Sequence, residues 1–158
     1  MKRVLIIWLN VLCLVAIRNP QVFANTPIHN HQPPKCITLP TGTLVLLETA
    51  ERTASERATI GKQVLFRVRA NVVVDGQVVI STGALAIGRV KSIRKNTYNF
   101  PESLALEVTA VQTIDGRLVA LHGNEQTFTG LFPGESMYVE PGQTMTASLM
   151  NNETIYLP

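Results

Sequence analysis

Residues 71–80 have the sequence NVVVDGQVVI, in which an Asp-Gly pair separates two short apolar runs. The stretch QTIDGRLVAL at 112–121 repeats this arrangement. Asp-Gly between apolar runs is the strongest local sign of a β-hairpin, because both central residues of a type I′ turn need positive φ. We therefore expect two hairpins with two-residue turns, with Gly76 and Gly116 at positive φ.

The sequence around these turns alternates with period two, as expected for strands that bury one face. In 63–74 the inward side would carry Val64, Phe66, Val68, Ala70 and Val72, opposite Arg67, Arg69 and Asn71. In 104–114 it would carry Leu104, Leu106, Val108 and Ala110, opposite Glu107, Thr109 and Thr113. Each stretch is predicted to be a strand with one core face.

Three stretches share a glycine-containing turn followed by a short apolar strand: LPTGTLVLLE at 39–48, ISTGALAIGRV at 80–90 and VEPGQTMTASL at 139–149. Repeated turns and strands suit a sheet that closes on itself and leaves few free edges. Only 48–59 has a helical pattern, which its threonines weaken. We predict an all-β domain, a small closed or partly closed β-barrel or barrel-like sandwich with at most one short helix.

The N-terminus has the order of a secretory signal peptide: Lys2 and Arg3, an apolar run over 4–17, and Val22-Phe23-Ala24. The run is shorter than the roughly 20 residues that span a bilayer. We expect cleavage after Ala24, with an uncleaved membrane anchor as the alternative. A lipoprotein is disfavoured because bulky Leu12 precedes Cys13. The mature protein would have no transmembrane span and would be exported to the periplasm, the cell envelope or the outside.

Residues 25–35 (NTPIHNHQPPK) form a predicted proline-rich linker, and 36–158 a single domain. The chain has 14 basic and 11 acidic residues, and three of the basic ones lie in the signal. The remainder is formally neutral, which gives no electrostatic case for a nucleic-acid partner. It is long enough to bury a core without disulfides.

Cys36 is the one cysteine left after cleavage, so it could form a disulfide only between two chains. His29 and His31 precede it in an H-x-H-x4-C pattern that suits zinc or copper. Three ligands in a proline-rich tract more often belong to a solvated linker, so we expect no metal and no cofactor.

We find no catalytic constellation in the sequence. His122 follows an apolar run and is interpreted as a strand-end residue, while Asp75 and Asp115 are explained as turn formers. Neither a nucleophile elbow nor an activated cysteine is visible. The sequence therefore favours a protein that is not an enzyme, with a hydrolase as the less favoured reading.

The domain resembles the β-barrel domain of the envelope-spanning scaffold proteins of bacterial conjugation and type IV secretion systems. The resemblance covers 39–121 and rests mainly on turn glycines and strand residues: Gly42-Thr43, Gly61, 64–68, Asp75-Gly76, 79–84, Gly88, 104–111 and Asp115-Gly116. The family has isoleucine and proline where this chain has Ser81-Thr82. The chain is also similar to small exported bacterial domains. The resemblance implies a barrel fold; no pore role is carried over, since we see no long helical insertion.

Two segments, NFPES at 99–103 and LFPGES at 131–136, interrupt the alternation with Phe-Pro. Proline excludes a central-strand position, so each loop can hold an aromatic ring away from the ladder. We predict a partner-binding patch of Tyr98, Phe100 and Phe132 with Arg94 and Lys95. The alternative is that the rings turn inward and plug the barrel.

The basic group Arg89, Lys91, Arg94 and Lys95 has two interpretations: protection of an edge strand, or attraction to an acidic glycan or phospholipid. Together these features predict an exported cell-envelope accessory or scaffold module that acts through protein contacts. A ligand-binding or glycan-binding module is the alternative.

Overall fold

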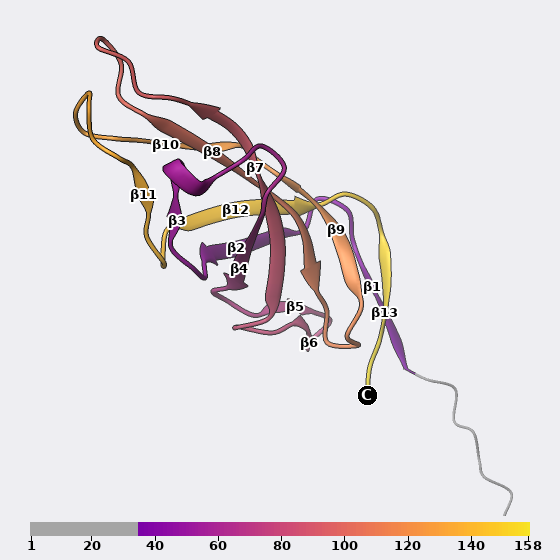
Figure 1. Cartoon of the computed structure of the whole chain (residues 1–158). Helices are drawn as coiled ribbons and strands as arrows, with labels where there is room; N and C mark the ends of the chain where they lie inside the picture. Colours follow the sequence, from indigo (N-terminus) through magenta and orange to yellow (C-terminus); the bar gives the residue numbers. More distant parts are fainter. Residues whose placement is uncertain (1–34) are drawn as a thin grey trace, which may run out of the picture. The chain divides into compact units, whose positions relative to one another are not determined.

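The computed structural model describes residues 35–158, which form an all-β domain, as predicted. Figure 1 shows the strands, joined by short turns and a few longer loops. They are β1 Cys36–Leu39, β2 Leu44–Thr49, β3 Thr53–Ala54, β4 Gln63–Val68, β5 Val72–Val74, β6 Gln77–Ile80, β7 Leu85–Arg94, β8 Ser103–Gln112, β9 Leu118–Gly123, β10 Gln126–Thr129, β11 Tyr138–Val139, β12 Thr144–Leu149 and β13 Glu153–Tyr156. The stretch 48–59 contains no α-helix, only one 3-10 turn, η1, over Ser55–Arg57.

Six antiparallel strands close into a barrel in the order β8-β7-β4-β2-β12-β9, with β9 pairing back onto β8. Strand β8 is long enough to have two partners on this side. Its C-terminal part, Ala110–Gln112, pairs with β9, and its N-terminal part, Ser103–Leu106, pairs with β10. The chain passes from β9 to β10 at Gly123, where a Cβ would overlap the backbone of Val108.

The repeated glycine turns have one structural role. Gly42, Gly83 and Gly142 all have positive φ and precede β2, β7 and β12. Their amides donate to the carbonyl oxygens of Leu149, Val68 and Thr49, the last residues of β12, β4 and β2, at 2.8–2.9 Å. Each turn is therefore bonded to the end of a neighbouring strand, and only glycine adopts this backbone without strain.

The core fills the barrel with aliphatic side chains around one aromatic ring, that of Phe66 on β4, which is completely buried. The predicted alternation holds in β4 for Val64, Phe66 and Val68. Gly88 on β7 makes room for this ring: a Cβ there would overlap the Phe66 ring and the Glu107 carbonyl oxygen. The pairing of β7 with β8 shifts register beside Gly88, which accommodates the close approach.

The predicted single strand over 63–74 is wrong beyond Val68. The chain leaves the barrel there, exposes Ala70 and resumes as the separate β5–β6 hairpin. Thr113, predicted to face solvent, is buried at 4% exposure. Its hydroxyl lies 2.5 Å from Asp115 Oδ1 and 3.0 Å from the Arg117 carbonyl oxygen, so burial leaves it hydrogen-bonded.

The two Asp-Gly hairpins differ in their turns. Asp75 and Gly76 both have positive φ, +50° and +74°, in the predicted two-residue turn between β5 and β6. Gly116 also has positive φ, +82°, but Asp115 does not. The Thr113 amide donates to the Arg117 carbonyl at 2.9 Å, which leaves three residues in the loop. The prediction of a two-residue turn there is wrong, because the loop has three residues. The Asp115 carboxylate accepts hydrogen bonds from the Thr113 hydroxyl and from the Arg117 and Tyr156 amides.

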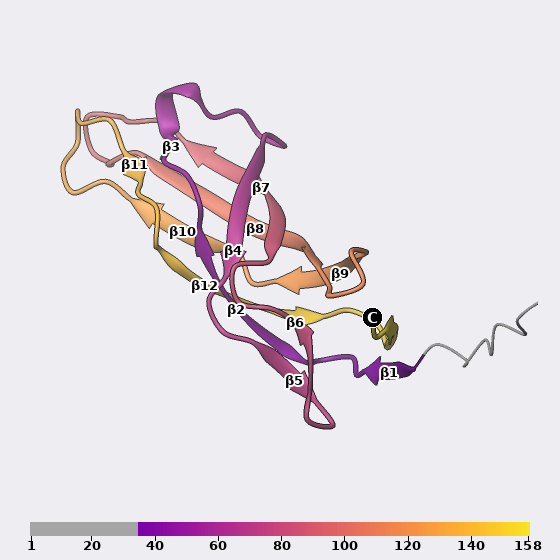
Figure 2. The ribbon, with the colours of Figure 1, turned by 90° about the horizontal axis from the view of Figure 1, so that it is seen from below.

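Asp115 and Arg117 hold β13 at the barrel end that also carries the β1–β13 pair. The Tyr156 amide donates to Asp115 Oδ2 at 3.2 Å, and the Arg117 side chain donates to the Thr154 carbonyl. These contacts occupy polar groups that β13 would otherwise leave free. We call this region, residues 113–117 with β1 and β13, the clasp end; Figures 1 and 2 place it opposite the loops that follow β7 and β10.

Candidate functional site

The candidate site lies at the end opposite the clasp, where two loops meet. The first loop, 95–102, joins β7 to β8, and the Thr97 and Phe100 backbones exchange hydrogen bonds of 3.1 and 3.2 Å. Tyr98 is therefore held at the tip of a tight turn. The second loop, 130–137, follows β10 and bends at Gly134, which has positive φ. We call the two loops together the loop end.

Large apolar side chains at the loop end project into solvent. Tyr98 is 96% exposed, Leu131 85%, Phe132 61% and Phe100 57%. The rings therefore do not plug the barrel, whose aromatic core residue is Phe66. A cluster of exposed apolar side chains is typical of an interaction surface. These four residues are called the aromatic patch below.

The predicted basic members of the patch behave differently from each other. The Arg94 guanidinium lies over the Phe100 ring, 5.7 Å from its centroid, and so contacts the aromatic patch. Lys95 instead donates to the Ser55 carbonyl at 3.1 Å and to Glu102 Oε1 at 3.5 Å. It therefore anchors the base of the loop.

The rest of the basic group is also paired. Arg89 and Lys91 both contact Glu107 Oε2, at 3.0 and 3.2 Å. Strand β7 lies between β4 and β8 as far as Arg89, so protection of an edge does not explain that residue. One carboxylate, that of Glu107, is thus shared by two cations of the basic group, which it neutralises only in part.

A buried polar cluster fixes the two loops against η1. The Ser55 hydroxyl lies 2.6 Å from Glu102 Oε2, and the Met137 amide donates to Ser55 Oγ at 3.2 Å. Ser55 is fully buried and Glu102 is 5% exposed. Burial acts to raise the pKa of Glu102, but hydrogen bonds from Ser55, Met137 and Lys95 outweigh it and lower that pKa. We call Ser55, Lys95 and Glu102 the loop anchor.

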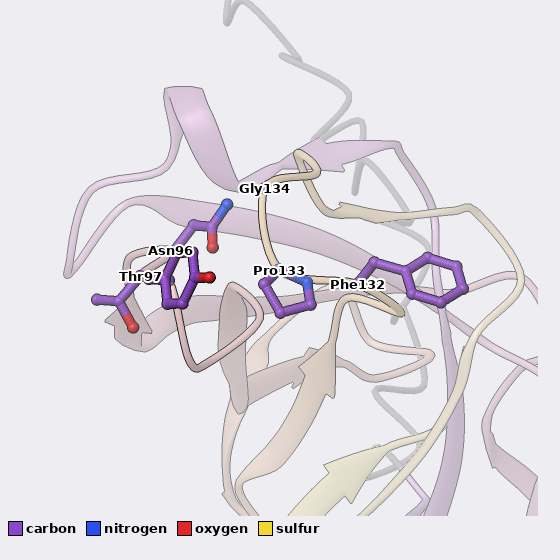
Figure 3. Close-up of a pocket in the computed structure, with 6 residues that line it drawn as sticks. Asn96, Thr97, Phe132, Pro133 and Gly134 are labelled. Atoms are coloured by element: carbon purple, nitrogen blue, oxygen red, sulfur yellow. The ribbon is translucent and has the colours of Figure 1, made fainter.

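A hollow of about 670 Å³ opens between the loops. Its lining residues are Asn96, Thr97, Tyr98, Phe132, Pro133 and Gly134. Figure 3 shows Asn96 and Thr97 on one side and Pro133 opposite, with the Phe132 ring pointing away from them. The lining carries no ionised group, so the hollow suits an uncharged ligand with an apolar face.

Asn96 connects this hollow to a second, more polar one of about 400 Å³ that Glu56, Glu135 and Ser136 also line. Among residues 35–158, Asn96 Oδ1 is the one buried side-chain oxygen or nitrogen that has no hydrogen-bond partner. Buried polar atoms are nearly always paired, so an unpaired acceptor beside a hollow is a sign of a ligand site.

A third hollow, of about 400 Å³, lies beside η1 and β11 and is lined by Arg52, Arg57, Lys62 and Tyr138 among others. Arg52 bonds Glu140 at 3.0 Å and stacks on the Tyr138 ring at 3.9 Å. The positive charge of Arg52 is thus paired with the carboxylate of Glu140.

The other sequence candidates lie apart from the loop end. His122 is exposed on β9, with Ser148 as its cross-strand neighbour. Cys36 is an exposed free thiol at the start of β1, and whether it links two chains stays a prediction. His29 and His31, the signal peptide and most of the linker fall outside the described residues. Within 35–158 we find no group of metal-ligating side chains and no helix long and apolar enough to cross a membrane.

Fold and site together define a small closed antiparallel β-barrel with an aromatic loop end. No protein-family model matches the chain, and no curated protein is similar to it. The resemblance to secretion scaffolds therefore stays an expectation from the sequence.

Proposed function

We propose that this protein is a non-enzymatic accessory or scaffold module of the bacterial cell envelope that binds another protein through its loop end. One observation supports this most: two loops separated in sequence present Tyr98, Phe100, Leu131 and Phe132 together in solvent. Aromatic anchors give binding surfaces large contact area for little lost side-chain entropy.

The loop anchor supports the same proposal. Loops that are held by buried hydrogen bonds lose less entropy on binding than free loops do. Ser55 and Glu102 join η1 to the start of β8, and the Met137 amide adds the second loop. These buried hydrogen bonds thus hold in place the two loops that carry the aromatic patch. The envelope location rests on the N-terminal sequence pattern alone.

Site-specific photocrosslinking in cells that export the protein tests this proposal. A photoreactive amino acid replaces Tyr98 in one variant and Leu44, a 71% exposed residue on the barrel wall, in a matched control. We expect a discrete crosslinked protein from position 98 and little from position 44. Equal crosslinking from both positions would contradict a specific site at the loop end.

A glycan ligand is the second candidate, favoured by the hollow beside Tyr98 and by the unpaired Asn96 oxygen. Sugar rings stack their C–H faces on aromatic side chains, and their hydroxyl groups can donate to an amide oxygen. Binding of the mature protein to a glycan array, lost in Tyr98→Ser and kept in Leu44→Ser, would replace the protein-contact proposal with this one.

A further inference from the structure

The hollow between the loops has features that suit an extended, proline-containing peptide. Its walls combine Tyr98 and Pro133 with an uncharged polar side chain, Asn96. Proline-rich peptides in the polyproline II conformation dock in aromatic-lined grooves, because they are already extended and lose little entropy on binding. Their backbone groups, which have no internal hydrogen bonds, are free to bond the groove.

Asn96 supplies the matching polar group. Its side-chain amide offers one acceptor and two donors, which can pair with the N–H and C=O groups of a peptide backbone. The oxygen has no partner within 35–158. A half-turn about χ2 exchanges the amide oxygen and nitrogen without changing the volume of the side chain, so either atom can face the hollow. After such a half-turn, a peptide N–H in the hollow can donate to the Asn96 oxygen, which has no partner in its buried position.

The chain itself contains a segment with the required chemistry. Residues 25–34, NTPIHNHQPP, include three prolines and no Lys, Arg, Asp or Glu. The absence of these charged side chains matches the uncharged lining of the hollow, and cleavage after Ala24 would leave one charge at the segment's end, on the α-amino group of Asn25. In a polyproline II conformation ten residues extend about 30 Å, which is ample to fill such a site.

In sequence the segment is followed by Lys35 and then by β1, which belongs to the clasp end. Both views place β1 at the opposite end of the barrel from the two loops (Figures 1 and 2). Lys35, the residue before β1, is fixed there because its carbonyl accepts the Leu157 amide at 2.8 Å. A segment that starts at one end is better placed to reach the loop end of a neighbouring copy than that of its own chain.

We propose that residues 25–34 of one copy bind in the hollow between the loops of the next copy, so that the chain associates head to tail. This inference rests on the proposed function, because it takes the loop end to be a protein-binding site and names a second copy as the partner. Such a contact uses two different surfaces, so a pair of copies keeps one free hollow on one copy and one free segment on the other, and further copies can add at both ends.

A synthetic peptide tests the inference directly. Fluorescently labelled NTPIHNHQPP is titrated with the mature protein, and fluorescence anisotropy reports binding. We expect saturable binding, about tenfold weaker in Tyr98→Ser and in Asn96→Leu and unchanged in Leu44→Ser. A control peptide with Pro27, Pro33 and Pro34 replaced by glycine should also bind about tenfold more weakly, because it must lose more conformational entropy.

NMR of the isotope-labelled wild-type protein gives a reading that needs no variant. The unlabelled peptide should shift the amide signals of 96–98 and 132–134 and leave those of β2 unchanged. No saturable binding, or equal binding of the glycine peptide, would overturn the inference. If the peptide fails while Tyr98 still crosslinks to a different protein in cells, the inference is wrong and the proposed function stands.

Discussion

The two ends of the barrel differ in how their polar groups are paired and in how far their side chains are exposed. At the clasp end, Asp115 is 9% exposed and accepts hydrogen bonds from Thr113, Arg117 and the Tyr156 amide. At the loop end, Asn96 Oδ1 is buried without a partner and Tyr98 is 96% exposed. The hydrogen bonds of Asp115 stabilise the fold, whereas the Asn96 oxygen and the Tyr98 ring make no such contacts and can bind another molecule. We therefore assign stability to the clasp end and contact to the loop end.

The largest expected effect is on the loop anchor. Glu102→Ala leaves Ser55, Lys95 and the Met137 amide without their carboxylate partner in a buried site, which should cost about 3 kcal/mol of unfolding free energy. Urea unfolding measures this cost. A loss below about 0.5 kcal/mol would mean that the loops do not depend on the anchor.

The second largest effect should come from acid, which removes the stabilisation that the Asp115 carboxylate gives the clasp end. Burial acts to raise the pKa of Asp115, but hydrogen bonds from Thr113, Tyr156 and Arg117 outweigh it and hold that pKa at about 2, below its ordinary value of 3.8. Because the folded-state pKa is the lower one, the stabilisation is present above pH 4 and lost as the pH falls toward 2.

The contribution of Asp115 is about 2 kcal/mol, since one pKa unit corresponds to about 1.4 kcal/mol. Urea unfolding of the wild type and of Asp115→Asn at several pH values isolates it from other carboxylates. The difference between the two proteins should shrink by about 1–2 kcal/mol between pH 5.5 and pH 2.5. A difference that stays constant with pH would show that Asp115 is not held in this way.

The two hairpin turns provide a smaller effect. Gly76→Val and Gly116→Val place a β-branched residue at φ of +74° and +82°, which should cost about 1–2 kcal/mol each through backbone strain. Neither glycine has neighbouring atoms that a Cβ would meet, so the cost would come from conformation alone. Unchanged thermal melting of both variants would refute the positive φ at these turns.

The smallest effect on stability should come from the aromatic patch. Replacing Tyr98, Phe100 and Phe132 together by serine removes rings that are 57–96% exposed, so the melting temperature should change by only a few degrees. Inward-facing rings would instead lose roughly 1.5 to 3 kcal/mol each. Unfolding of the triple variant under conditions where the wild type is folded would contradict the exposed arrangement.

Much of the barrel follows from local sequence signals. The Asp-Gly pairs predicted both hairpins, and the three glycine turns predicted the starts of β2, β7 and β12. Period-two alternation predicted the inward faces of β4 and of the first half of β8. These features depend on residues close in sequence, and for that reason they could be seen without a structure.

The features that were missed depend on residues far apart in sequence. Ser55 and Glu102 are 47 residues apart, and neither lies in a local pattern that suggests a buried pair. The contact of Asp115 with Tyr156 spans 41 residues, so the sequence showed only its role as a turn former. The Phe-Pro repeat predicted two loops, but it left open whether their rings point outward or into the barrel and did not show that both loops would border one hollow.

The most direct test of the central claim measures partner capture and folding in the same samples. Tagged wild type, the triple serine variant of Tyr98, Phe100 and Phe132, and Leu44→Ser are exported, crosslinked and purified, and each is checked by thermal melting. We predict that the triple variant melts within a few degrees of wild type but loses the captured partner, while Leu44→Ser keeps it. A folded triple variant that captures the same partner in the same amount would contradict the account.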